Sequence, residues 1–239
     1  YYFYKVFNKL FIKVFHTNGL GAYVFIMSLI SGTPSNAYIL KELVINNKLS
    51  SEEASHFLMF TYFSNPLFLI VMLSTIFPYN TTIKIIIIHY ISNLLIAFLM
   101  RKKAPKITNI NLQKEKNSSK NILIKSINKS MNTLLMILGS IIFYMLLTYI
   151  VTFPILKNHL LKTILSGFLE ITNGLNNLIY LETYSKIKEI IAISIISFGG
   201  LSIHTQIKSI LEDTKINYSS FLKGRIIHVI VSICILAFI

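Results

Sequence analysis

The chain has 239 residues, of which 54% are hydrophobic and only 13% charged, and its mean hydropathy is +0.64. A soluble domain carries about 25% charged residues, so this deficit, with apolar residues gathered in long runs, excludes an ordinary soluble globule. Cys234 is the single cysteine, which excludes an intrachain disulfide and multi-cysteine metal sites. We expect it to be a small buried residue.

The first third of the chain contains two apolar stretches, and each of them is interrupted. Residues 19–30 lead into Ser-Gly-Thr-Pro-Ser-Asn at 31–36, and residues 57–77 contain an internal Ser-Asn-Pro. Between the two stretches, Ser50 and Glu53 form a capping-box pattern. This pattern predicts the start of a helix.

Residues 82–100 form an uninterrupted apolar span that is followed by a basic loop. At about 1.5 Å per residue the span is long enough to cross a hydrocarbon core of ~30 Å. Nine of the 23 Lys and Arg residues lie between Arg101 and Lys129, against one acid, Glu115. Basic residues crowded between apolar spans follow the positive-inside rule. Residues 101–130 are therefore predicted to be cytoplasmic, with anionic lipid headgroups rather than nucleic acid as their partner.

After this loop, residues 131–153 and 221–239 are uninterrupted spans, the first of them stopped by Pro154. Two further stretches are broken, because 160–181 contains Glu-Ile-Thr-Asn-Gly and 190–211 contains Ser-Phe-Gly-Gly. Breaks at membrane depth leave backbone groups unpaired, and they are tolerated where they pack in protein or line a wet cavity. A single break is commonly a kink, whereas four breaks in one chain favour a polar cavity.

An ungapped internal similarity relates the two halves of the chain when Gly32 is aligned with Gly199. At this constant offset the matching pairs are Ser35 with Ser202, Leu40 with Ile207, Lys41 with Lys208, Leu43 with Ile210, Lys48 with Lys215, and Leu49 with Ile216. The number of predicted crossings between the two matching turns is odd, so the turns are expected on opposite sides of the membrane. Residues 1–100 and 131–239 are therefore predicted to be inverted repeats, an architecture common among secondary transporters.

Several segments of the chain resemble the YlbJ-type sporulation integral membrane proteins, in the nucleoside-recognition, or Gate, domain group. They are Ser31–Pro34, Ser50–Ala54, Phe60 and Ser64–Phe68 in the first half, and Gly167–Thr172, Phe198–Gln206 and Gly224–His228 in the second. The resemblance covers most of the chain outside 101–130. The family usually has an aromatic residue at Thr33 and glycine at Asn36 and Asn65. Its members are longer, so we expect further helices before Tyr1.

The resemblance implies an all-α polytopic membrane protein with two inverted Gate-like repeats containing broken or re-entrant helices. It also implies an endospore former, a place in the mother cell's outer forespore membrane, and transport of dipicolinic acid toward the forespore. The wider group is similar in fold to concentrative nucleoside carriers. We therefore predict a carrier of a small anionic metabolite in the bacterial cytoplasmic membrane. The alternatives are a nucleoside-type carrier and a non-transporting scaffold in spore-envelope assembly.

The candidate binding groups are glycines that allow close backbone approach, together with hydroxyl, amide and charged side chains near the breaks. The predicted substrate-binding residues are Ser31, Gly32, Pro34, Ser35, Asn36, Asn65, Glu170, Thr172, Asn173, Gly199, Gly200, Ser202, His204, Gln206 and Arg225. For the hydroxyls, the alternative is a bond back to their own helix. For Arg225 the alternative is a lipid headgroup, and for His204 it is a neutral hydrogen-bonding role. No cofactor or metal site is predicted.

Glu170 lies about ten residues into an apolar stretch, with no basic residue within a helical turn or two. An ionisable group at this depth costs about 2.5–3.5 kcal/mol on insertion scales and marks a functional site. We predict that Glu170 binds a coupling proton or cation, the alternative being a protonated or paired structural glutamate.

One short motif is relevant to a catalytic function. The sequence Gly-Leu-Ser-Ile at 200–203 has the form G-x-S-x, and an intramembrane serine protease would need Ser202 within hydrogen-bond reach of His228. Neither an H-E-x-x-H motif nor a phosphate-binding glycine loop is present in the sequence. We therefore expect a protein that is not an enzyme.

Overall fold

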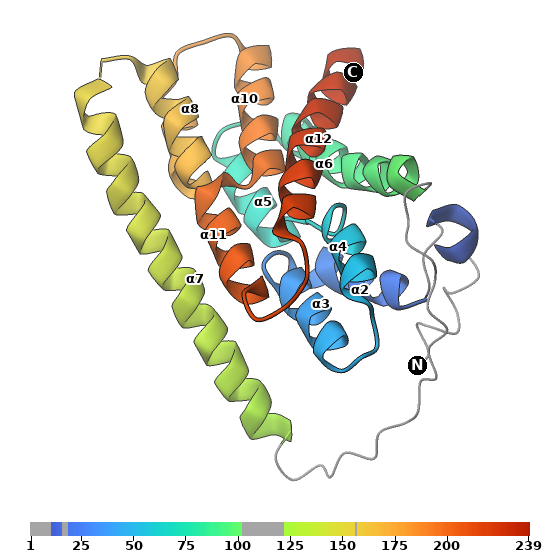
Figure 1. The fold of residues 1–239 in the computed structure, drawn as a ribbon. Helices are drawn as coiled ribbons and strands as arrows, with labels where there is room; N and C mark the ends of the chain where they lie inside the picture. The colour runs from blue at the N-terminus through green and yellow to red at the C-terminus, as the bar shows by residue number, and fades with distance from the viewer. Residues whose placement is uncertain (1–10, 16–18, 102–121, 156) are drawn as a thin grey trace.

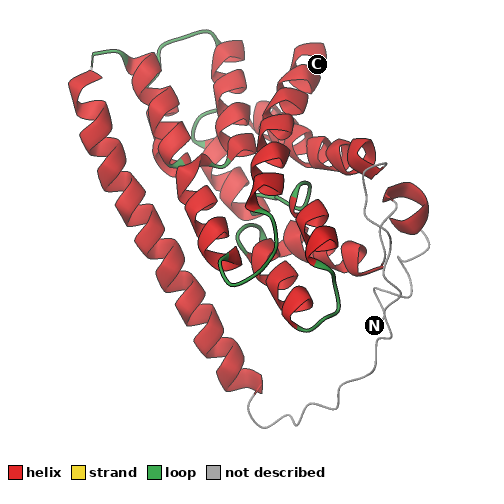
Figure 2. Ribbon diagram, in the orientation of Figure 1, coloured by secondary structure: helices red, strands yellow, loops and turns green. Residues whose placement is uncertain are grey.

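The structure, a computed structural model, describes residues 11–15, 19–101, 122–155 and 157–239. Within these ranges the regular elements are helices (Figure 1, Figure 2). In chain order they are α2 (Gly19–Ser31), α3 (Ser35–Ile45), α4 (Ser51–Leu58), α5 (Pro66–Ser74), α6 (Tyr79–Met100), α7 (Ile122–Thr152), the short 3-10 helix η3 (Phe153–Ile155), α8 (His159–Leu169), α9 (Ile171–Ile179), α10 (Ser185–Phe198), α11 (Gly200–Leu211) and α12 (Tyr218–Phe238). The predicted all-α fold is confirmed.

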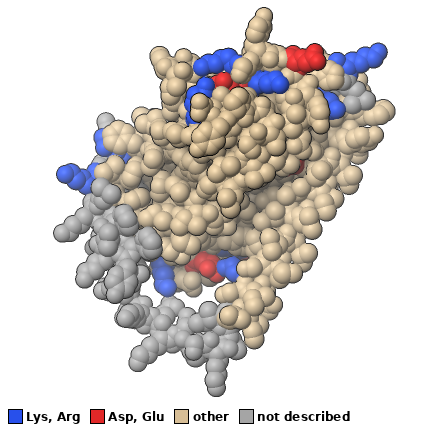
Figure 3. All heavy atoms as spheres, turned by 180° about the vertical axis from the view of Figure 1, so that it is seen from behind, with Lys and Arg blue, Asp and Glu red and all other residues tan. Residues whose placement is uncertain are grey.

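Within the described residues, four helical stretches are long and apolar enough to cross a membrane. They are Tyr79–Met100, Ser126–Thr152, Ser185–Leu211 and Tyr218–Phe238. Helices α6, α7 and α12 correspond to the three uninterrupted spans predicted from the sequence. On the face drawn in Figure 3, charged side chains gather toward the two ends of the molecule, and a broad band between them is almost uncharged. This distribution is that of an integral membrane protein.

Helix α7 begins earlier than the sequence predicts. Its first residue is Ile122, so the last part of the predicted loop at 101–130 is helical, while 102–121 lie outside the described residues. Lys129 in this early part forms an ion pair with Glu42 of α3. One of the basic residues assigned to lipid headgroups therefore has a protein partner.

The outer faces of α7 and α12 carry exposed apolar side chains. Leu134 and Leu146 on α7 and Ile230 on α12 are each more than half exposed. Cys234 is also exposed on α12, so the expectation that it is buried is wrong. The reason is that the outer face of a membrane helix contacts hydrocarbon, which accepts a small apolar side chain as readily as a protein interior does.

Helices α8 and α9 fold back on each other at Glu170, so residues 160–181 form a hairpin and not the predicted crossing. Glu170 is extended, with φ −148° and ψ 128°, and the loops that flank the hairpin lie at the same end of the molecule (Figure 1). The arms meet at two glycines, because a Cβ on Gly174 would lie only 2.6 Å from the Gly167 nitrogen. With one crossing fewer the count is even, and the two matching turns lie at the same end of the molecule, where Lys41 pairs with Asp213 at 3.1 Å and the Asn217 N–H bonds to Ser55 at 2.8 Å. The expectation that these turns lie on opposite sides is therefore wrong, and the inverted repeats are not confirmed.

Two hydrophobic clusters hold the broken helices together. One joins α2, α3, α4 and α11, and its aromatic residues include Phe25 and Phe63, whose rings meet edge to face at 5.0 Å. The other joins α5, α6, α9 and α10. The predicted capping box is confirmed at the start of α4, where Ser50 and Glu53 each accept the other's backbone N–H at 3.1 Å.

Candidate functional site

Glycines in left-handed conformations make two of the four breaks. Gly32, between α2 and α3, has a φ of 73°, and Gly199 and Gly200, between α10 and α11, have φ values of 94° and 65°. Glycine adopts this region without the steric cost that a side chain adds. A Cβ on Gly32 would lie 3.0 Å from the Asn65 nitrogen, and one on Gly200 would lie 3.3 Å from the Glu170 Cα. Breaks that are far apart in sequence therefore touch.

The breaks surround a cavity of about 220 Å³. It is lined by Thr33 and Pro34 from the first break, Ser64, Asn65 and Phe68 from the second, Glu170, Ile171 and Thr172 from the hairpin tip, Ser202, Ile203 and Gln206 from α11, and Ile137 and Ile141 from α7. The predicted site residues among them are Pro34, Asn65, Glu170, Thr172, Ser202 and Gln206. The structure thus brings together residues that the sequence separates widely.

Two polar side chains at this cavity have no partner. Ser202 and Gln206 are 1% and 3% exposed, and neither side chain forms a hydrogen bond with another described residue. They lie four residues apart on α11 and so share one face of the helix. Their polar atoms are not among the enclosed unpaired ones, so they open onto the cavity and are available to a ligand or to water.

The helix N-termini near the cavity are of two kinds. Asn65 caps α5, accepting a backbone N–H at 2.9 Å, and Glu170 caps α9, accepting the N–H of Asn173 at 2.8 Å. Helices α3 and α11 instead start after Pro34 and Gly199, and neither receives a side-chain cap. The first N–H groups of an uncapped helix point away from it, and its positive end favours an anion.

Glu170 is 3% exposed and lies at the tip of the hairpin, facing the cavity. Among the described lining residues it is the one with an ionisable side chain, and no described Lys or Arg pairs with it. Its Oε2 caps α9, which gives it a structural role, while Oε1 forms no hydrogen bond within the described chain. The predicted site residue Asn173 contributes through its backbone N–H.

Arg225 does not line the cavity. Its side chain is fully buried at 0% exposure, which excludes the alternative of a lipid headgroup contact. The guanidinium donates to the Met59 carbonyl at 2.9 Å and to the Ser197 carbonyl at 3.4 Å, and its carbon lies 4.1 Å from the centre of the Tyr62 ring. These carbonyls end α4 and α10, so the cation lies where two half-helices present their negative ends.

The extended segment between α4 and α5 is paired almost throughout by side chains and by the first break. The pairs are Asn93 Nδ2 to the Tyr62 carbonyl, the Thr33 N–H to the Phe63 carbonyl (2.9 Å), the Tyr90 hydroxyl to the Ser64 carbonyl (2.9 Å), and the Ser64 N–H to His89 Nε2 (3.2 Å). Non-helical backbone at membrane depth requires such internal partners. This part of the structure is therefore scaffold.

His204 belongs to the same scaffold and not to the cavity lining. Its Nε2 lies 3.1 Å from the Phe198 carbonyl, and its Nδ1 lies 2.7 Å from the Tyr218 hydroxyl. Tyr62 serves the same helix end by donating to the Ile196 carbonyl at 3.2 Å. The carbonyls released where α10 stops at Gly199 thus have side-chain partners, and His204 takes the hydrogen-bonding role that was its alternative.

The remaining predicted site residues lie at the edge of the first break. Ser31 donates to the Met27 carbonyl of its own helix at 2.6 Å, which is the alternative role given for the hydroxyls. Asn36 is buried, and its Nδ2 reaches the Thr61 hydroxyl at 3.5 Å while its Oδ1 has no partner. Ser35 is partly buried at the start of α3 and lines none of this cavity.

Sequence reasoning missed the polar face of α6. His89 and Asn93 are fully buried and support the extended segment. The signal was present, because these residues are four apart within an apolar span and so share one face. His228 on α12 joins this network through Arg225 at 2.7 Å and the His89 carbonyl at 3.0 Å, so its two ring nitrogens are engaged by partners other than Ser202.

Apolar spans, broken helices with internally paired backbone and charge at the two ends define a polytopic α-helical integral membrane protein. No family model matches the chain, and no solved structure gives a significant match.

The chain is similar to the sporulation integral membrane protein YlbJ of Bacillus subtilis (strain 168), with 27% identity over 256 aligned positions. The alignment covers 90% of this chain and 62% of the relative, so the chain spans less than two thirds of that protein's length. This likeness supports a YlbJ-type assignment. The grouping with Gate domains stays a prediction.

Proposed function

We propose that this chain is part of a sporulation-associated carrier for a small anionic metabolite, which binds in the cavity between the four breaks. One observation carries the proposal: interruptions from separate parts of the chain converge on a cavity where Ser202 and Gln206 are buried without partners. Unpaired polar side chains that open onto an internal cavity suit a binding site, because a bound ligand can pair with them. The role in sporulation is taken from the name of the relative.

The chemistry of the lining supports an anion that enters with a proton or a cation. Helices α3 and α11 offer uncapped N-termini, and Ser202 and Gln206 offer hydrogen-bond donors. Glu170, however, faces the same space. A bound carboxylate would be repelled by an ionised Glu170 unless a proton or cation neutralised the pair. Glu170 is therefore the proposed coupling residue, and dipicolinate, with its two carboxylates, is the proposed substrate.

Uptake of radiolabelled dipicolinate into liposomes containing the purified protein tests this proposal. Glu170→Gln keeps an oxygen that can cap α9, so the hairpin should stay folded, but it removes the titrating group. We expect initial uptake to fall roughly tenfold or more, since a hydrogen bond to a charged group is worth about 1.5–3 kcal/mol. Dependence of uptake on an imposed pH or cation gradient should disappear.

Glu182→Gln is the matched control, because Glu182 is an exposed glutamate in the loop after α9. It should leave uptake and its gradient dependence unchanged. Saturable uptake of nucleosides without dipicolinate would favour the nucleoside-type carrier. An absence of uptake for both solutes by folded protein would leave the scaffold function.

A further inference from the structure

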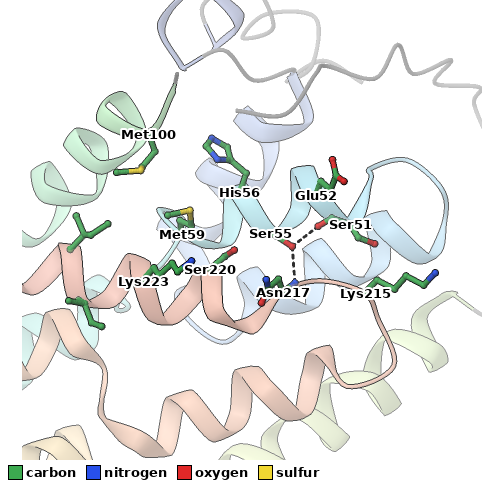
Figure 4. A pocket seen from close by; sticks show the side chains of 12 residues that line it. Ser51, Glu52, Ser55, His56, Met59, Met100, Lys215, Asn217, Ser220 and Lys223 are labelled. Atoms are coloured by element: carbon green, nitrogen blue, oxygen red, sulfur yellow. Dashed lines mark hydrogen bonds between the residues drawn. The ribbon is translucent and has the colours of Figure 1, made fainter. Parts of the chain in front are cut away.

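A second cavity, of about 770 Å³, lies between α4, the start of α12 and the end of α6 (Figure 4). The character of its lining changes along α12. Polar side chains line the part near the start of the helix, and they include Ser51, Lys215, Ser220 and Lys223. Apolar side chains line the rest, and they are Met59, Met100, Ile226 and Ile227.

The polar part of this cavity is basic. Lys215 and Lys223 are exposed, and neither forms an ion pair with a described acid. Figure 4 shows Lys223 on α12 and Lys215 in the loop before it, at the far end of the cavity, with Glu52 across from Lys215 on α4. Glu52 is the one acidic residue among the described residues of the lining, so the two lysines outweigh it in charge. An anion that reaches Lys215 and Lys223 would gain two charged donors.

Hydroxyl groups add neutral donors to the same place. The side chains of Ser51 and Ser220 have no hydrogen-bond partner among the described residues. Ser55, by contrast, is occupied, because it donates to the Ser51 carbonyl at 2.6 Å and accepts from the Asn217 N–H at 2.8 Å (Figure 4). Two lysines and two free hydroxyls suit the several oxygens of a phosphate group.

The apolar part continues onto the outer surface of the helix bundle. Ile226 of the lining is 49% exposed, and Ile230, one turn further along α12, is 57% exposed. On α6, Leu95 and Leu99 before Met100 are 40% and 58% exposed. These side chains face the hydrocarbon in a membrane, so a chain leaving the cavity would stay in apolar surroundings.

We propose that this cavity binds one anionic phospholipid. Its phosphate lies at Lys223, on the side of the cavity toward Lys215, whose charge adds to the attraction, and an acyl chain runs past Met100 and Ile226 toward the bilayer. Lys223 is five residues into α12, about 7.5 Å along the axis, a depth from which a lysine side chain reaches the headgroup region. Basic pockets between membrane helices bind anionic headgroups in this way.

Native mass spectrometry of the detergent-solubilised full chain, titrated with dioleoylphosphatidylglycerol or dioleoylphosphatidylcholine, tests the proposal. The protein should bind the anionic lipid in preference to the zwitterionic one. The double variant Lys215→Gln, Lys223→Gln should bind phosphatidylglycerol roughly 30-fold more weakly, since each basic residue near an anionic headgroup contributes about a fivefold factor. Glu52→Gln should tighten binding, because it removes the opposing charge.

The double variant Lys157→Gln, Lys162→Gln removes the same charge around the start of α8 and should leave binding unchanged. Equal loss in both double variants would overturn the proposal, since it would mean a general surface-charge effect. Displacement of the lipid by soluble glycerol phosphate would also overturn it, because the site would then be one for free phosphate. Circular dichroism of each variant checks that the helices are intact.

Discussion

Two buried polar regions of this protein treat their hydrogen-bonding groups in opposite ways. Around Arg225, charged and amide side chains donate hydrogen bonds to backbone carbonyls that have no helical partner because the helices are broken. At the cavity, Ser202 and Gln206 are as well buried and have no partner. In the first region most of the buried groups are paired within the protein, with His89 Nδ1 and Arg225 Nε left over, whereas in the second neither side chain is paired.

This difference distinguishes polar residues that stabilise the fold from polar residues that can bind a ligand, although the two kinds look alike in sequence. A polar residue in an apolar span is expensive, and both regions contain such residues. The Arg225 region offsets that cost by pairing backbone that has no helical partner. At the cavity, the cost of the polar side chains is offset only when a ligand or water enters and pairs with them. Substitutions in the first region should therefore act on stability, and substitutions in the second on binding.

The largest effect on stability is expected for Arg225→Met. This change leaves the Met59 and Ser197 carbonyls without their donor and removes the cation over the Tyr62 ring. At about 1–3 kcal/mol for each unpaired buried group, we expect a loss of about 3 kcal/mol or more in the free energy of unfolding. Unfolding in mixed micelles, followed by circular dichroism, measures it.

The control for this substitution is Lys208→Met, an exposed lysine on α11. Its free energy of unfolding should stay within about 0.5 kcal/mol of the wild type. A stable Arg225→Met protein that had lost uptake would contradict the scaffold role and return Arg225 to the substrate site.

A smaller loss is expected at the hairpin that carries Glu170. Gly174→Ala would place a Cβ 2.6 Å from the Gly167 nitrogen, and backbone there cannot yield as a side chain can. Overpacking of this kind costs about 1–3 kcal/mol. Gly139→Ala on α7 meets nothing within 4 Å and should be neutral or stabilising by up to about 1 kcal/mol. Melting temperatures in detergent compare the two, and equal values would show that the hairpin arms do not touch.

The sequence was sufficient to predict the spans and the breaks, because both depend on local residue types. Apolar length predicted α6, α7 and α12, and Gly and Asn-Pro signals predicted where helices stop. It also predicted part of the cavity lining, since polar residues beside breaks are the ones that can face a common space. Local residue types did not, however, predict the direction that the chain takes after a break.

Local signals could not tell a kinked crossing from a hairpin at 160–181. The direction of the chain after Glu170 depends on contact between Gly167 and Gly174, seven residues apart, which is a packing property. The role of Arg225 was missed for the same reason. Its partners, Met59 and Ser197, come from other helices, and no spacing in the sequence relates them to it.

The smallest effect on stability, and the sharpest test of the comparison, is expected for Ser202→Ala combined with Gln206→Met. Neither side chain forms a hydrogen bond in the described structure, so replacing them leaves no partner unpaired. The free energy of unfolding should change by less than about 1 kcal/mol, and in the stabilising direction if the cavity is dry. Dipicolinate binding, measured by isothermal titration calorimetry, should nevertheless weaken roughly 30-fold, since two neutral hydrogen bonds of about 1 kcal/mol each are lost. A double variant that is strongly destabilised and still binds with full affinity would mean that these residues belong to the scaffold, and the distinction between the two regions would fail.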